Sequence, residues 1–240
     1  MEKSNIDEKI KLLTGSGMWH TQETEGLPSV HLSDGPHGLR KQEEKERQNN
    51  VSLVSTCYPT ASALACSWDV TAAERLGRAV AKEAWNADVA VLLGPGINMK
   101  RSPLCGRNFE YFSEDPFLAG RLGAAYVSAA QGEDVAVSLK HFAANNQETN
   151  RQTSNSQIDE RALREIYLSA FEYVVKTARP ATIMASYNRL NGYYACENRH
   201  LLTEILREEW GFDGVVISDW GACADLAKAV KAGMDLEMPD

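Results

Sequence analysis

The sequence has few of the features that mark secreted, membrane-bound or nucleic-acid-binding proteins. Its five cysteines include no Cys-x-x-Cys pair, which argues against a disulfide framework and a zinc site. No apolar run approaches the roughly 20 residues of a membrane span, and residues 1–8 are polar. The net charge of -8 would repel phosphate backbones. We therefore expect a cytoplasmic chain that has no metal, cofactor, membrane or nucleic-acid partner.

The composition is that of one globular domain. With 240 residues, of which 43% are hydrophobic and 24% charged, the chain can bury a substantial core. No linker rich in Pro, Gly or Ser divides it, and the charged stretch at 41–47 indicates a solvated loop. The sequence therefore predicts a single domain over residues 1–240.

Short apolar runs alternate with longer amphipathic stretches from about residue 70 onward, as in repeated strand-helix units. The expected helices span 71–86, 115–131, 160–176, 201–210 and 222–232, and the expected strands span 89–93, 136–139, 181–185, 214–217 and 235–238. The segment 94–96 (GPG) is too weak a glycine motif to indicate a dinucleotide site. This pattern favours an α/β fold, a TIM-barrel-like (β/α)8 domain that is incomplete at its C-terminal end.

Polar side chains follow four of the predicted strands at the point where each strand ends. They are Asp34 after 30–33, Lys140 and His141 after 136–139, Tyr187 after 183–186, and Asp219 and Trp220 after 215–218. Barrel enzymes place their reactive groups at these C-terminal strand ends, so we expect these side chains to meet at one mouth. Carboxylates, amines and an indole face suit a ligand rich in hydroxyl groups.

Each of these residues also has a structural interpretation when it is taken singly. Asp34 could organise a turn, and Asp219 could cap a helix that begins near Ala222. Lys140 and His141 could be a solvated pair, and the two aromatic side chains could be ordinary packing. Their convergence on one face favours the functional interpretation, because turn-formers and caps have no reason to gather there.

Six ordered segments give the sequence a strong resemblance to glycoside hydrolase family three, in its β-glucosidase branch. They are 33–40 (SDGPHGLR), 94–98 (GPGIN), 102–110 (SPLCGRNFE), 140–148 (KHFAANNQE), 186–188 (SYN) and 211–220 (GFDGVVISDW). The β-N-acetylhexosaminidases of this family carry a Pro-Gly-His-Gly loop after Lys-His-Phe. Here the corresponding segment, 142–146, reads FAANN, which favours the glucosidase branch.

The resemblance implies hydrolysis of terminal β-D-glucosyl bonds in carbohydrate catabolism, with retention of configuration. Asp219 matches the family's nucleophile, which attacks the anomeric carbon and forms a covalent glycosyl-enzyme. The family's sugar-binding positions fall on Asp34, Arg107, Lys140 and His141, a residue beside the nucleophile on Tyr187, and part of the sugar-binding wall on Trp220. Nearby cations are expected to keep Asp219 ionised.

The resemblance leaves one catalytic group unassigned. A retaining hydrolase needs a second carboxyl group as acid and base, and in this branch a Glu of a following α/β sandwich domain supplies it. That domain is absent from residues 1–240, and Glu110, Glu148 and Glu237 match no such role. We therefore expect part of a longer β-glucosidase, inactive or weakly active by itself, whose partners are a β-glucoside or oligosaccharide and the missing domain or an oligomer.

Two other hypotheses remain open on the sequence. The chain could be a non-catalytic carbohydrate-binding or partner-binding protein that kept the sugar-contacting residues. It could also be a Schiff-base barrel that uses Lys140, although His141 beside it and the ordered motifs argue against this.

Overall fold

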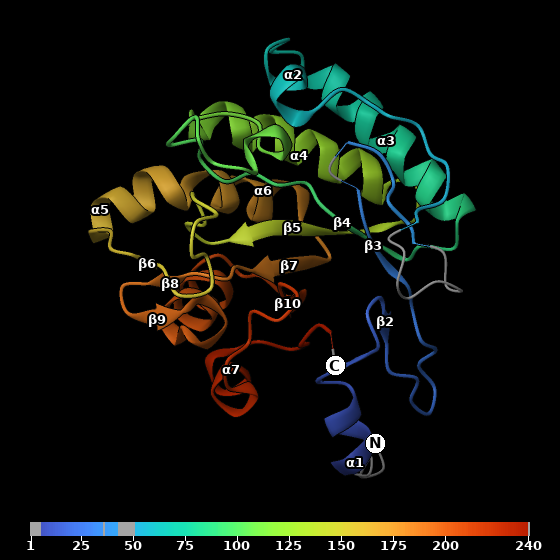
Figure 1. The fold of residues 1–240 in the computed structure, drawn as a ribbon, viewed down its shortest axis with the longest axis vertical. Helices are drawn as coiled ribbons and strands as arrows, with labels where there is room; N and C mark the ends of the chain where they lie inside the picture. Colours follow the sequence, from blue (N-terminus) through green and yellow to red (C-terminus); the bar gives the residue numbers. More distant parts are fainter. Residues whose placement is uncertain (1–5, 36, 43–50, 240) are drawn as a thin grey trace.

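The computed structural model describes residues 6–35, 37–42 and 51–239, which form a parallel sheet with helices on its outer side (Figure 1). Pro36 and residues 43–47, on which parts of the sequence predictions fall, lie outside this described part. The sheet has five strands in the order β10-β7-β5-β4-β3. They span Leu32–Asp34 (β3), Val91–Leu93 (β4), Ala136–Phe142 (β5), Thr182–Ala185 (β7) and Val215–Ser218 (β10).

Strands that are adjacent in the sheet follow one another along the chain, and every pair among the five is parallel. A doubly wound sheet would reverse its strand order at a switch point. The steady order is that of a barrel wall, and it confirms the predicted TIM-barrel-like α/β class.

Helices α3 (Val70–Asn86), α4 (Pro116–Gln131) and α6 (Ser169–Ala178) cover one face of the sheet (Figure 1). The carboxylate of Asp69 caps α3 and that of Asp115 caps α4, each accepting main-chain N–H groups of the first turn. The sequence predicts one helix over 160–176. The structure instead has a short α5 (Glu160–Ala162), a π-helical turn (Leu163–Tyr167) and α6.

The remaining short elements surround the ends of the sheet. The other described helices are α1 (Ile6–Lys11), α2 (Ala61–Ala65), α7 (Leu226–Ala232), a π-helix (His200–Glu209) and two short 3-10 helices (Asn108–Glu110 and Ala195–Glu197). A small sheet of β6 (Asn155–Ser156), β8 (Arg189–Leu190) and β9 (Tyr193–Tyr194) ties the loop after β5 to the loop after β7. This small sheet holds residues of both loops near the mouth of the barrel.

The apolar core has two layers. The larger layer lies between helices and sheet, where α3 and α4 approach so closely that a Cβ on Gly77 would meet the Tyr126 carbonyl oxygen at 2.5 Å. The smaller layer fills the inside of the barrel. It is made of Leu32, Val91, Leu93, Met184, Ile217, Leu236 and Met238. The barrel interior is therefore a packed core at its base, and its chemistry is confined to the strand ends.

Backbone pairing continues beyond both edges of the five-stranded sheet. Leu236 forms a parallel bridge with Ile217, and its neighbour Glu237 forms another with Thr14. Thr14 leads into β1 (Gly15–Ser16), which pairs with β2 (His20–Thr21), and His20 bridges His31 just before β3. These bridges connect the C-terminal segment to β3 through the N-terminal hairpin. Local patterns do not predict this contact, because Gly15 and Glu237 lie more than 200 residues apart in the sequence.

None of the described helices is both long and apolar enough to cross a membrane. Among the residues that the structure describes, no group of His, Cys, Asp and Glu is arranged to hold a metal ion.

Candidate active site

Asp219 follows β10 directly and is 6% exposed. Its Oδ1 accepts the backbone N–H of Trp220 at 2.8 Å, while its buried Oδ2 has no hydrogen-bond partner among the described residues. The interpretation of Asp219 as a helix cap is wrong, because α7 begins at Leu226 and Asp225 caps it. One carboxylate oxygen is thus fixed by the main chain, and the other accepts no hydrogen bond from the described residues.

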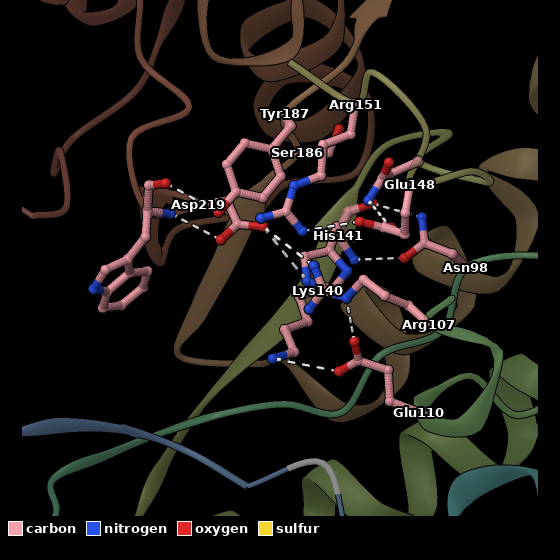
Figure 2. A network of polar contacts seen from close by, with 12 residues as sticks. Asn98, Arg107, Glu110, Lys140, His141, Glu148, Arg151, Ser186, Tyr187 and Asp219 are labelled. Atoms are coloured by element: carbon pink, nitrogen blue, oxygen red, sulfur yellow. Dashed lines mark hydrogen bonds and ion pairs between the residues drawn. The ribbon is translucent and has the colours of Figure 1, made fainter. Parts of the chain in front are cut away.

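Cationic and imidazole groups surround Oδ2 of Asp219 (Figure 2). Arg107 Nη1 lies 3.7 Å from Asp219 Oδ2, and His141 Nε2 lies 3.6 Å from the same atom. Lys140, at the end of β5, places its Nζ 3.4 Å from Asp34 Oδ1. The structure therefore brings together Asp34, Arg107, Lys140, His141 and Asp219, as the sequence predicts.

Burial dominates the protonation of the central carboxyl group. It raises the pKa of Asp219 above its ordinary value, while the charges of Arg107 and Lys140 act in the opposite direction. From the sequence, the neighbouring cations are expected to keep Asp219 ionised. They do favour the charged form, yet the net direction is upward because the side chain lies in a buried site.

His141 is fully buried and fixed on two sides. Asn98 holds its main chain, accepting from the His141 N–H at 2.7 Å and donating to the His141 carbonyl oxygen at 2.8 Å. The hydroxyl of Tyr111 lies 2.9 Å from Nδ1 of the ring. Burial and the neighbouring cations Arg107, Lys140 and Arg151 lower the pKa of His141 well below its ordinary value. The imidazole is therefore neutral in this site.

Tyr187 lies beside Asp219, as the sequence predicts (Figure 2). Its hydroxyl donates to the Trp220 carbonyl oxygen at 2.9 Å, and its ring lies 4.0 Å from the Arg151 guanidinium carbon. Arg151 in turn pairs with Glu148 at 2.9 Å. This stack brings the loop after β5 against the loop after β7.

Trp220 contacts the N-terminal hairpin. Its ring centroid is 5.3 Å from that of Trp19, and its Nε1 donates to the Met18 carbonyl oxygen at 2.7 Å. The indole therefore links the residue after the candidate nucleophile to the segment that closes the barrel. Its part in a sugar-binding wall stays a prediction.

Sequence reasoning missed several residues that complete the site. The most telling is Glu110, which is 4% exposed, pairs with Arg107 and places its Oε2 3.6 Å from Lys140 Nζ. Its position three residues after Arg107 was the available signal. The others are Asn98, Tyr111, Glu148 and Arg151. Asn98 and Tyr111 contact His141, and Arg151 contacts Tyr187, across different segments, and a sequence pattern does not report such contacts.

These observations define a barrel-type α/β domain with a buried strand-end carboxylate, flanked by cations and a neutral imidazole. Comparison with known proteins agrees with this class. The family model described as "Glycosyl hydrolase family 3 N terminal domain" matches residues 36–240. The chain belongs to glycosyl hydrolase family 3, and the predicted family is confirmed.

Relatives and solved structures agree with the family. The chain is 52% identical over 243 residues to the thermostable β-glucosidase B of Acetivibrio thermocellus, covering 100% of this chain and 32% of that protein. It is 51% identical over 239 residues to an exo-α-(1→6)-L-arabinopyranosidase of Bifidobacterium longum, covering 98% and 32%. The β-glucosidase of Kluyveromyces marxianus in complex with glucose superposes with a TM-score of 0.94 at 44% identity, covering 99% of this chain and 28% of that one. The chain spans about a third of the length of the curated relatives it matches.

Proposed function

We propose that Asp219 is the nucleophile of a retaining β-glucosidase. The observation that carries the proposal is the buried Oδ2 of Asp219, which accepts no hydrogen bond from the described residues and lies within 3.7 Å of Arg107 Nη1 and His141 Nε2. In this reaction the carboxylate forms a bond to the anomeric carbon as the glycosidic bond breaks. Water then hydrolyses the glycosyl-enzyme with net retention. Relatives named β-glucosidases support this activity.

The surrounding polar groups would bind the sugar ring in this mechanism. Asp34 would accept hydrogen bonds from hydroxyl groups, and Arg107 and Lys140 would donate to them. Arg107 would also stabilise the ionised carboxylate before it attacks and after the glycosyl-enzyme is hydrolysed, because its Nη1 lies 3.7 Å from Oδ2. As expected from the sequence, Trp220 would form part of the sugar-binding wall, and Tyr187 would lie beside the nucleophile.

We further propose that the acid/base carboxyl group is supplied from outside residues 1–240, by the sandwich domain expected from the family. It would have to approach to roughly 5 to 5.5 Å from Asp219. Glu110 and Glu148 are poor substitutes, because each is already paired with a cation, Arg107 and Arg151 respectively. The five cysteines are free thiols, which fits the cytoplasmic location expected from the sequence. Cell fractionation tests that location.

A covalent probe tests the nucleophile without the acid. A 2-deoxy-2-fluoro-β-D-glucoside with a dinitrophenolate leaving group needs no protonation to depart, so the chain should be labelled at Asp219 and the labelled peptide found by mass spectrometry. Asp219→Asn should abolish labelling. Asp225→Asn, the matched control at a helix cap, should keep it. Binding of glucose without labelling, even when the rest of the protein is supplied, would favour the non-catalytic alternative.

A second sugar is a candidate for the substrate. A relative named as an arabinopyranosidase shares 51% identity with the chain, which makes an α-L-arabinopyranoside a reasonable substrate as well. The two candidates differ in ring configuration and in the hydroxymethyl group of glucose. Rates with matched nitrophenyl β-D-glucoside and α-L-arabinopyranoside separate them. We expect the glucoside to be preferred.

A further inference from the structure

The imidazole of His141 has one engaged nitrogen and one free nitrogen. Nδ1 lies 2.9 Å from the Tyr111 hydroxyl, while the buried Nε2 has no hydrogen-bond partner among the described residues. Nε2 lies 3.6 Å from the equally unpartnered Oδ2 of Asp219. Two buried atoms without hydrogen-bond partners therefore face each other, and the position of one hydrogen decides whether Nε2 is a donor or an acceptor beside Oδ2.

The surroundings of His141 and Tyr111 determine how many hydrogens these two side chains share. Burial and three neighbouring cations keep the pKa of His141 low, so the ring carries a single N–H. Burial also raises the pKa of Tyr111 well above its ordinary value, so the phenol keeps its hydrogen. The pair thus shares two hydrogens. Either Tyr111 donates to Nδ1 and the ring hydrogen is on Nε2, or Nδ1–H donates to the phenol oxygen.

The second arrangement has two energetic penalties. Within the described part of the chain, the Tyr111 hydroxyl has no hydrogen-bond partner other than His141, so its own hydrogen would be buried without an acceptor. Leaving a buried donor unsatisfied costs about 1–3 kcal/mol. The lone pair of Nε2 would also face the lone pairs of Asp219 Oδ2 at 3.6 Å. In the first arrangement the Tyr111 hydroxyl is satisfied. The Nε2–H has no acceptor within hydrogen-bond distance, but it faces the Asp219 carboxylate oxygen 3.6 Å away, so the electrostatic contact is attractive instead of repulsive.

We infer that Tyr111 is a positioning residue, which donates to His141 Nδ1 and thereby fixes the Nε2–H tautomer beside Asp219. His141 then presents a hydrogen-bond donor to whatever occupies the space next to Oδ2. Asn98 fixes the main chain of His141 through its two amide contacts, so the direction of this donor is fixed as well. The inference rests on the proposed function only for the statement that the acceptor is a sugar oxygen.

The tautomer can be measured directly in the chain labelled with 15N-histidine. The sequence has five histidines, and a His141→Gln variant identifies the signals of this ring by their loss. Long-range 1H–15N correlation spectra should show His141 with hydrogen on Nε2 alone. A spectrum with hydrogen on Nδ1, or a mixture of the two forms, would overturn the inference. This measurement on the unmodified chain decides the tautomer even if a Tyr111 variant does not fold.

The role of Tyr111 is tested with a matched pair of variants. Tyr111→Phe removes the donor, so the Nε2–H form should no longer be exclusive. Tyr126→Phe also removes a buried hydroxyl, but within α4, and should leave the His141 spectrum unchanged. A Tyr111→Phe spectrum identical to the unmodified one would show that another group sets the tautomer. Asp219→Asn should keep the Nε2–H form, because Tyr111 remains.

The labelling reaction adds a functional readout. Tyr111→Phe should slow the covalent labelling of Asp219 by about tenfold or more, the equivalent of one lost hydrogen bond in the transition state. Tyr126→Phe should label at the unmodified rate. Equal rates for both variants would contradict the positioning role. If the unmodified chain is not labelled at all, the proposed function fails, while the 15N spectra still decide the tautomer.

Discussion

The barrel has two differently built parts, and the comparison between them explains where the site lies. Strands β4, β5, β7 and β10 form parallel pairs, with one register shift between Lys140 and Phe142, and lie beneath long helices. The closing seam, formed by the N-terminal hairpin and residues 235–238, is joined to the sheet and to itself by a two-residue hairpin pairing and isolated bridges. The side chains nearest the free oxygen of Asp219 come from the first part. The seam contacts the residues around Asp219: Trp19 and Met18 contact Trp220, and Met238 hydrogen-bonds Ser218 and Gly221.

The two parts of the barrel differ in how precisely they position their residues. In the helix-covered part each strand is held by neighbours on two sides and by a helix layer, so a strand end is placed within narrow limits, as a reactive group requires. The seam is held by isolated backbone bridges, by side-chain contacts of Asp235 with Arg207 and of Ser218 with Met238, and by one apolar cluster. We expect the two parts to respond differently to the same kind of change, and the following variants test this from the largest effect to the smallest.

Glu110→Ala should have the largest effect on stability. It leaves the buried guanidinium of Arg107 and the ammonium of Lys140 without their shared carboxylate, and breaking a buried pair in this way costs about 3 kcal/mol. Urea unfolding measures the loss. Glu209→Ala, which breaks the exposed pair with Arg164, is the control and should cost about 1 kcal/mol or less. Equal losses would mean that the site adds no special constraint.

Two glycine substitutions compare the two parts directly. A Cβ at Gly77 meets the main-chain carbonyl of Tyr126 at 2.5 Å, which cannot move without moving α4. A Cβ at Gly15 in the seam meets the Met238 sulfur at 2.6 Å, an atom of a flexible side chain. Gly77→Ala should therefore lower the free energy of unfolding by about 2 kcal/mol, and Gly15→Ala by less than about 1 kcal/mol. The reverse order in thermal or urea unfolding would refute the proposed contrast.

Trp220→Phe tests the connection between the seam and the site. The variant keeps an aromatic ring against Trp19 but loses the Nε1 hydrogen bond to the Met18 carbonyl oxygen, a loss of about 1 kcal/mol. Trp85→Phe, at an exposed position in α3, should have almost no effect on stability. Denaturation midpoints compare the two variants. No difference between them would show that the seam does not depend on this contact.

The effect that is smallest near neutral pH is a pH dependence located at His31, beside the seam. Burial, with smaller contributions from His20 and Lys41, lowers the pKa of His31 to about 4. Between this value and the ordinary histidine value of about 6.5, the unfolded chain binds a proton that the folded chain does not. The stability due to the neutral ring is therefore present above pH 6.5 and is lost as the pH falls toward 4. His31→Gln should flatten this part of the curve of unfolding free energy against pH, and an unchanged slope would contradict the assignment.

Much of the helix-covered part of the barrel was predictable from residue patterns. The long apolar helices and the short buried strands repeat with periods that the backbone geometry requires, and strand ends place polar side chains at one mouth. Asp219, Lys140 and His141 could be predicted as site residues for this reason. The break in the helix predicted over 160–176 could not be predicted, because a π-helical turn at Leu163–Tyr167 leaves the hydrophobic spacing almost unchanged.

Local pattern and family motifs in the sequence determined the class of fold, the family and the carboxylate at the end of β10. Only the tertiary structure decided what surrounds that carboxylate and how the barrel closes. The amide of Asn98 and the phenol of Tyr111 reach His141 across 43 and 30 positions, and Gly15 reaches Glu237 from the other end of the chain. Periodicity records only which face of its own element a residue occupies. The partner on that face, and with it the free oxygen of Asp219, is set when distant segments pack together.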